Sequence, residues 1–198
     1  MKKNLMLGSL LLCALLATRA SADDKGASAA KDAEMKAWMA AATPGVPHQE
    51  LSSMAGTWDA EVKDFMNPSG PPVVTKGVSE FSMELGGRFL LQKFHGTMMG
   101  QPYEGIGYTG YDNVQKKYVS VYMDNMGTGM MPSTGTENPA TKKVTYVGSM
   151  WDATSGAEVK MDQVLTLTDT DHCTFEMFVP SPDGKKMKAM EINYTRRK

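Results

Sequence analysis

Cysteine and histidine are scarce in this sequence of 198 residues, which contains two cysteines and three histidines. The histidines, at positions 48, 95 and 172, have none of the close spacings of zinc motifs such as HxxxH or HExxH, and no cysteine pair accompanies them. Beyond the N-terminal region, no run approaches the roughly 18 apolar residues that a transmembrane helix needs. These absences argue against a classical zinc site and against a helical membrane span.

An excess of positive charge is also missing. The sequence has 21 basic and 22 acidic residues, a formal net charge of −1. Nucleic-acid-binding domains usually carry a basic surface, so we expect no nucleic-acid partner. There is no G-x-S-x-G motif and no local Ser-His-Asp grouping. Because catalytic triads assemble in space, these last absences leave open whether the protein is an enzyme, and we assign no catalytic residue and no cofactor.

The first 22 residues have the three parts of a secretory signal peptide. Lys2 and Lys3 form a basic start, residues 5–17 are apolar, and residues 20–22 (Ala-Ser-Ala) form an A-x-A cleavage site. The pattern predicts cleavage after Ala22 and a periplasmic or secreted protein.

Cleavage would change both the charge and the cysteine count. The remaining chain would carry 18 basic and 22 acidic residues, a formal net charge of −4. Its single cysteine, Cys173, could form no intramolecular disulfide, so the core alone must stabilise the fold. Cys173 alternates with Phe175 and Met177, which favours a buried small apolar side chain over a reactive thiol.

Two helices are expected before the main domain. Residues 23–31 are small and polar and predict a flexible leader. Residues 31–42 favour a surface helix, with Met35, Trp38 and Met39 on one face. A second short helix is predicted over residues 47–55, with Pro47 in its first turn. The chain is thus divided into a signal peptide (1–22), a leader with a surface helix (23–46) and a single domain (47–198).

From Gly56 onward, apolar residues alternate with polar ones and turn signals recur regularly. This pattern is typical of antiparallel strands joined by short turns. Closure of such a meander into a barrel would remove its two exposed edges. The fold class predicted is all-β, an antiparallel up-and-down barrel of about ten strands. The expected strands are 56–66, 73–85, 88–98, 103–111, 117–124, 130–137, 142–151, 158–168, 172–179 and 186–196.

A barrel of this size has room for a ligand cavity as well as for side chains. Which strand face lines the interior is ambiguous. Segment 117–124 carries Tyr118 and Tyr122 on one face and the apolar Val121 and Met123 on the other. We expect the barrel to bind a small apolar or amphipathic molecule without catalysis. The predicted ligand-binding residues, with Arg88 as a polar anchor, are Trp58, Arg88, Phe89, Tyr108, Tyr122, Met123 and Met130.

Gly56-Thr57-Trp58 stands at the start of the first strand, just after a short helix. It resembles the G-x-W element of the lipocalin and calycin barrels. That resemblance implies that the tryptophan closes one end of the barrel, with a basic residue of the last strand, Arg196 or Arg197, lying over it.

Four longer segments resemble DUF1579, an exported bacterial family of unknown function. The resemblance covers roughly residues 47–197 and implies a barrel fold, but no activity and no catalytic residues. The segments that carry it are 85–90, 96–113, 116–131 and 182–196.

The sequence leaves four alternative functions to weigh. Residues 105–110 match G-x-G-x-x-G, but a strand rather than a helix follows, so we interpret these glycines as structural. A haem-binding barrel of the nitrobindin type would need an inward histidine, for which His95 and His172 are the candidates. The 18 methionines would suit Cu(I), although methionine also lines adaptable apolar pockets. An enzyme acting on a small hydrophobic or envelope-derived substrate is the remaining alternative.

Overall fold

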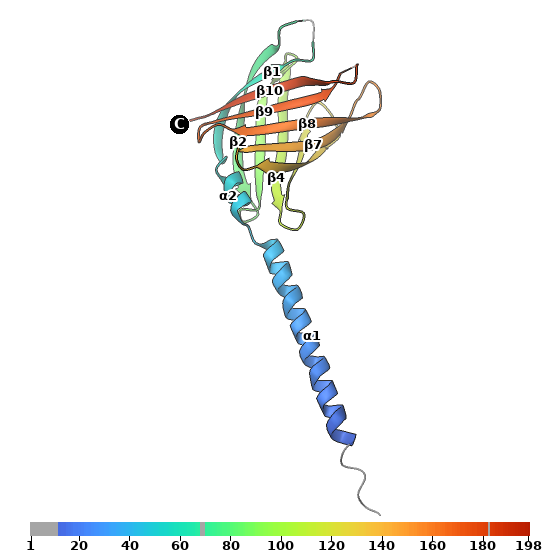
Figure 1. The fold of residues 1–198 in the computed structure, drawn as a ribbon. Coiled ribbons are helices and arrows are strands. Elements are labelled where there is room, and N and C mark those ends of the chain that lie inside the picture. Colours follow the sequence, from blue (N-terminus) through green and yellow to red (C-terminus); the bar gives the residue numbers. More distant parts are fainter. Residues whose placement is uncertain (1–11, 68–69, 182) are drawn as a thin grey trace, which may run out of the picture. The chain divides into compact units, whose positions relative to one another are not determined.

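The structure is a computed structural model that describes residues 12–67, 70–181 and 183–198. Across these residues the chain forms two helices and ten strands (Figure 1). The helices are α1 (Leu12–Ala42) and α2 (Val46–Ser52). The strands are β1 (Gly56–Asp64), β2 (Val73–Glu84), β3 (Phe89–Met98), β4 (Gln101–Asp112), β5 (Lys117–Asp124), β6 (Met131–Asn138), β7 (Lys143–Trp151), β8 (Glu158–Leu167), β9 (His172–Pro180) and β10 (Lys186–Arg196).

Internal contacts divide the chain into two units, residues 1–43 and residues 44–198. In the first unit α1 is one continuous helix of 31 residues, so the predicted flexible leader over 23–31 is wrong. Three of its nine residues are alanine, the best helix former, and extending an existing helix adds one hydrogen bond for each residue ordered. The start of the predicted signal peptide, residues 1–11, lies outside the described residues. No helix in the described ranges is long and apolar enough to cross a bilayer.

In the second unit the strands form a closed antiparallel barrel, which confirms the predicted fold class. Each strand pairs with its neighbours in the chain, and β1 also pairs with β10. Trp58 on β1 lies opposite Ser79 on β2 and opposite Arg196 on β10. Closure leaves no strand with unpaired backbone edges, which protects a long meander from aggregation.

The register defines which side chains face the interior, because directly paired residues of antiparallel strands project to the same face. On β1, Trp58, Ala60 and Val62 alternate inward and are buried. Following the pairs around the barrel assigns the even residues of β3 and β5 and the odd residues of β4 to the interior.

Helix α2 lies across one end of the barrel and packs into its core. Leu51 and Met54 are both only 5% exposed and belong to the same buried cluster as Trp58, whose Nε1 donates to the Met54 carbonyl at 2.8 Å. Pro47 occupies the first turn of α2, and His48 Nδ1 accepts a hydrogen bond from the Gly45 backbone. We call this the α2 end and the opposite one the far end.

Two glycines of the G-x-G-x-x-G segment have a packing role. Gly105 and Gly107 face the barrel interior on β4, and the Tyr122 side chain lies over both. A Cβ atom at Gly105 would overlap the Tyr122 phenol, and one at Gly107 would lie 3.0 Å from the ring. The glycines therefore make room for an interior aromatic side chain, and no helix follows them as a dinucleotide site would require.

Candidate ligand-binding cavity

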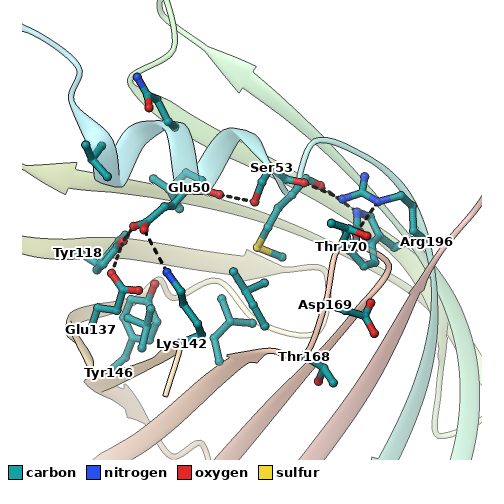
Figure 2. Close-up of a pocket in the computed structure, with 18 residues that line it drawn as sticks. Glu50, Ser53, Tyr118, Glu137, Lys142, Tyr146, Thr168, Asp169, Thr170 and Arg196 are labelled. Atoms are coloured by element: carbon teal, nitrogen blue, oxygen red, sulfur yellow. Dashed lines mark hydrogen bonds and ion pairs between the residues drawn. The ribbon is translucent and has the colours of Figure 1, made fainter. Parts of the chain in front are cut away.

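A cavity of about 760 Å³ opens at the α2 end (Figure 2). Its walls come from α2, from the interior faces of several strands, and from the β6–β7 and β8–β9 turns. The lining residues are Val46, Gln49, Glu50, Leu51, Ser53, Met54, Trp58, Tyr118, Glu137, Lys142, Val144, Tyr146, Leu165, Leu167, Thr168, Asp169, Thr170 and Arg196.

The middle of the cavity is apolar. Leu51 on α2 and Met54 in the turn after it line one side, and Val144 and Leu165, which pair across β7 and β8, line the other. Figure 2 shows the polar residues gathered in two groups on either side of this wall. An apolar wall with a few polar groups at its margins is the usual composition of a small-molecule site.

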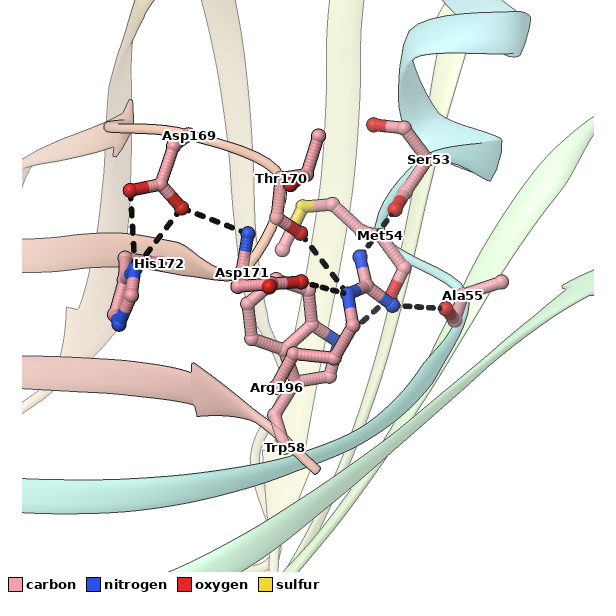
Figure 3. A network of polar contacts seen from close by, with 9 residues as sticks. All are labelled: Ser53, Met54, Ala55, Trp58, Asp169, Thr170, Asp171, His172 and Arg196. Carbon is pink, nitrogen blue, oxygen red and sulfur yellow. Dashed lines mark hydrogen bonds and ion pairs between the residues drawn. The ribbon is translucent and has the colours of Figure 1, made fainter. Parts of the chain in front are cut away.

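One polar group is centred on Arg196, each of whose three guanidinium nitrogens contacts the protein (Figure 3). Nη1 donates to the Ala55 carbonyl at 2.6 Å, Nη2 to the Ser53 carbonyl at 2.6 Å, and Nε to the Thr170 carbonyl at 2.9 Å. The guanidinium also lies 4.1 Å from the centre of the Trp58 ring. Arg196 thus ties the end of α2 to the β8–β9 turn.

The backbone conformation and the Arg196 side chain explain the glycine of the G-x-W element. Gly56 has a φ of 125°, a value that residues with a side chain rarely adopt. A Cβ atom there would lie 2.9 Å from Arg196 Nη1. The expectation that Arg196 or Arg197 covers Trp58 is met by Arg196, whereas Arg197 pairs with Asp59.

The other polar group brings two carboxylates to one phenol. Tyr118 Oη lies 3.1 Å from Glu50 Oε2 and 3.3 Å from Glu137 Oε2. Lys142 Nζ lies 3.8 Å from Glu50 Oε1, which is an ion-pair distance but too long for a hydrogen bond. Tyr146 stands beside this group, its ring centre 6.4 Å from that of Tyr118. We call these five residues the acidic corner.

Burial and the nearby carboxylates set the protonation of the two tyrosines. Burial, followed by the charge of Glu137, raises the pKa of both Tyr118 and Tyr146 above the ordinary value, and Glu50 adds to the effect at Tyr118. Both phenols therefore stay protonated at neutral pH, and Tyr118 donates to the carboxylates beside it. The corner is suited to holding a polar group in place.

The sequence resemblance is supported by a family comparison. Residues 43–196 match the model of the family described as "Protein of unknown function (DUF1579)". The chain belongs to the DUF1579 family. The membership that the four sequence segments predicted is therefore confirmed. No curated protein shows significant similarity to the sequence.

Solved structures share the barrel. Rv2717c from M. tuberculosis aligns with a TM-score of 0.58 and 17% identity, covering 78% of this chain and 100% of that one. The S-type phycobiliprotein lyase CPES from Guillardia theta aligns with a TM-score of 0.52 and 8% identity, covering 78% of this chain and 94% of the lyase. At these identities the likeness of the DUF1579 barrel to both structures concerns the fold alone.

Two of the predicted ligand-binding residues face the barrel interior. Trp58 lines the cavity and is 1% exposed. Tyr122 points inward over Gly105 but lies toward the far end, where its hydroxyl is 3.4 Å from that of Tyr103, which in turn donates to Asp124. Only Trp58 belongs to the α2-end cavity.

The prediction that Phe89, Tyr108 and Met123 line the interior is wrong. Each lies on the outer face in the observed register, and Tyr108 is 40% exposed. Both faces of their strands carry apolar residues, so alternation alone could not identify the inner one. The remaining two predicted residues do not lie on a strand. Arg88 lies in the turn between β2 and β3, and Met130 lies in the exposed loop before β6.

The candidate haem ligands are also misplaced. His95 and His172 are exposed on the outer face, next to Glu104 and Asp169 respectively. The buried histidine is His48 on α2, whose ring packs edge-on against Tyr111 at 6.0 Å. Within the described residues, no group of three or more His, Cys, Asp or Glu side chains is placed to hold a metal ion.

Most members of the acidic corner were not recognised from the sequence. Glu50 and Lys142 lie on a helix and in a turn, and only the closed fold brings them together. The alternation of the strands gave some indication of the two tyrosines. Tyr118 shares a strand face with Tyr122, and Tyr146 lies on the same face of its strand as Val144.

Proposed function

We propose that this DUF1579 protein binds a small amphipathic molecule in the cavity at the α2 end of the barrel. The observation that carries the proposal is the composition of that cavity, which combines an apolar wall with a polar corner on one side. Its volume of about 760 Å³ falls within the range of roughly 300–1,000 Å³ typical of ligand pockets. The protonated tyrosines favour binding over nucleophilic chemistry.

The proposal can be tested with a matched pair of valines on β7. Val144 lines the cavity and is 8% exposed, whereas Val147 faces outward and is 54% exposed. The probe is N-phenyl-1-naphthylamine, a neutral apolar fluorophore, titrated into the purified protein. Val144→Phe should weaken probe binding by about tenfold or more because the larger ring projects from the apolar wall into the space that the probe would occupy, whereas Val147→Phe should leave it unchanged. Equal affinity of the wild type and Val144→Phe would refute the proposal.

We also propose that the protein is exported. The support is the order of charge, apolar run and A-x-A site within residues 1–22. Removal of that segment would shorten α1 to the part that follows Ala22.

Copper binding remains a second candidate because five methionines belong to one cluster in the barrel interior toward the far end. Met161 is 1% exposed, and four partly buried methionines pack against its cluster. Thioethers are soft ligands that suit Cu(I). The four partners of Met161 are Met131, Met150, Met177 and Met187.

Competition against a chromophoric Cu(I) chelator tests this second candidate. A thioether site predicts that the wild type withdraws Cu(I) from the chelator and that Met150→Leu/Met177→Leu does so at least tenfold less well. Leucine conserves the apolar volume, so the fold should survive. If the double variant competes as well as the wild type, or neither competes, the methionines serve only as packing.

A further inference from the structure

The charged side chains around the cavity differ in how far they are paired within the protein. Each nitrogen of the Arg196 guanidinium donates to a backbone carbonyl, and its charge is shared with the Trp58 ring and with Asp171, whose carboxylate lies 3.5 Å from Nε. Asp169 is paired with His172, at 2.9 Å from Nδ1. The charged groups left to face a ligand are therefore those of the acidic corner, Glu50, Glu137 and Lys142, which carry one net negative charge when all are ionised.

The corner also contains more acceptors than donors. Tyr118 has a single hydroxyl proton, which can be donated fully to Glu50 or to Glu137 but not to both. Lys142 is beyond hydrogen-bond distance of Glu50, and its side chain is 60% exposed. In the part of the chain that the structure describes, Glu137 has no hydrogen-bond donor other than Tyr118. The two carboxylates therefore have capacity to accept further N–H or O–H groups.

A hydroxyl without a protein partner faces the cavity in the same corner. Tyr146 is 6% exposed, lines the cavity, and forms no hydrogen bond through its hydroxyl to any residue in the described ranges. Among the described residues no side-chain polar atom is both fully buried and unpaired, so the Tyr146 hydroxyl is open to the cavity and available to a molecule bound there. Its oxygen can accept a hydrogen bond just as the carboxylates can.

We infer that the cavity selects a ligand bearing a protonated amine, with the ammonium group held by Glu50, Glu137 and Tyr146 and the apolar part against Val144 and Leu165. An ammonium has three donors and no acceptor, which matches a corner rich in acceptors. Its positive charge also offsets the net negative charge of the corner. This inference rests on the proposed function, because it assumes that the cavity is the binding site.

Three probes of equal chain length separate the inference from the proposed function. Calorimetric titration at pH 7 with n-octylamine, n-octanol and n-octanoate compares a positive, a neutral and a negative head group on the same apolar tail. We expect octylamine to bind about tenfold more tightly than octanol, and octanoate to bind most weakly. Equal binding of all three would overturn the ammonium inference while leaving cavity binding intact. Binding that Val144→Phe does not weaken, or no binding at all, would overturn both.

Variants of the acidic corner provide a second test of the ammonium inference. Glu137→Gln should remove most of the preference for octylamine over octanol while leaving octanol affinity unchanged. Tyr146→Phe, which conserves the ring and so the packing, should reduce octylamine affinity by about threefold to tenfold. Glu104→Gln is the matched control, since this exposed carboxylate lies on β4 outside the cavity. If Glu137→Gln and Tyr146→Phe retain the full preference for octylamine, the inference is wrong.

Discussion

The guanidinium of Arg196 lies 4.1 Å from the centre of the Trp58 ring while its three nitrogens donate to the carbonyls of Ser53, Ala55 and Thr170. One side chain from the last strand thus holds the first strand, the end of α2 and the β8–β9 turn together (Figure 3). These contacts stabilise the side of the cavity opposite the acidic corner (Figure 2).

We predict that Arg196→Ala lowers the free energy of unfolding by about 3 kcal/mol, because charge-assisted hydrogen bonds and a cation–π contact are lost together. Arg196→Lys should be intermediate, since an ammonium cannot reproduce the planar fork. Urea denaturation followed by circular dichroism measures the effect. Arg197→Ala is the control and should change stability little, because its pair with Asp59 is exposed. An Arg196→Ala variant as stable as Arg197→Ala would contradict the role assigned to this residue.

Gly105→Ala should destabilise the barrel by about 1–3 kcal/mol, because the added methyl group overlaps the Tyr122 side chain. Removing the ring in Gly105→Ala/Tyr122→Ala should make the glycine substitution nearly neutral relative to Tyr122→Ala alone. A double-mutant cycle from thermal unfolding measures this coupling. Gly129→Ala should be neutral, since nothing lies within 4 Å of its added Cβ. Additive effects of the Gly105 and Tyr122 substitutions would show that the two residues do not pack as described.

The stability of the α2 end should depend on pH through His48. Burial lowers the pKa of this imidazole from its ordinary 6.5, the charge of Arg88 acts in the same direction, and a hydrogen bond with the Tyr111 backbone opposes them. The unfolded chain therefore takes up the proton first as the pH falls. The contribution of neutral His48 is complete above about pH 6.5 and is progressively lost below it.

Denaturant midpoints at pH 7.5 and pH 5.0 test this dependence. The wild type should lose more stability between the two than His48→Asn, which keeps a hydrogen-bond acceptor for the Gly45 backbone but cannot be protonated. His95→Asn, a substitution on the exposed outer face, should keep the wild-type slope. A slope in His48→Asn equal to that of the wild type would assign the pH dependence to other groups.

Export predicts a defined mature N-terminus. Intact mass spectrometry of the protein expressed in a bacterial host with its full sequence should find a chain that begins at Asp23 in the periplasmic or secreted fraction. Ala20→Lys/Ala22→Lys should block processing, since the cleavage site requires small residues. A wild-type protein found uncleaved in the cytoplasm would show that residues 1–22 are no signal peptide.

The sequence by itself was sufficient to predict the order and extent of the strands. Alternation with a period of two and regular turn residues are local properties, so the predicted strands match the observed ones to within a few residues at their ends. The family segments were also predictable, and the resemblance to the G-x-W element implied a basic residue over Trp58, although only the structure decided between Arg196 and Arg197.

Only the tertiary structure decided which face of each strand is the inside. Strand β5 carries aromatic or apolar residues on both faces, so Tyr122 and Met123 were equally plausible as interior residues until the register was known. The acidic corner required still more, because Glu50 and Glu137 are separated by most of the barrel in sequence. Pairing of β5 with β6 places Glu137 beside Tyr118, and docking of α2 brings Glu50 to the same phenol, so no local pattern in the sequence predicts that Glu50 and Glu137 meet.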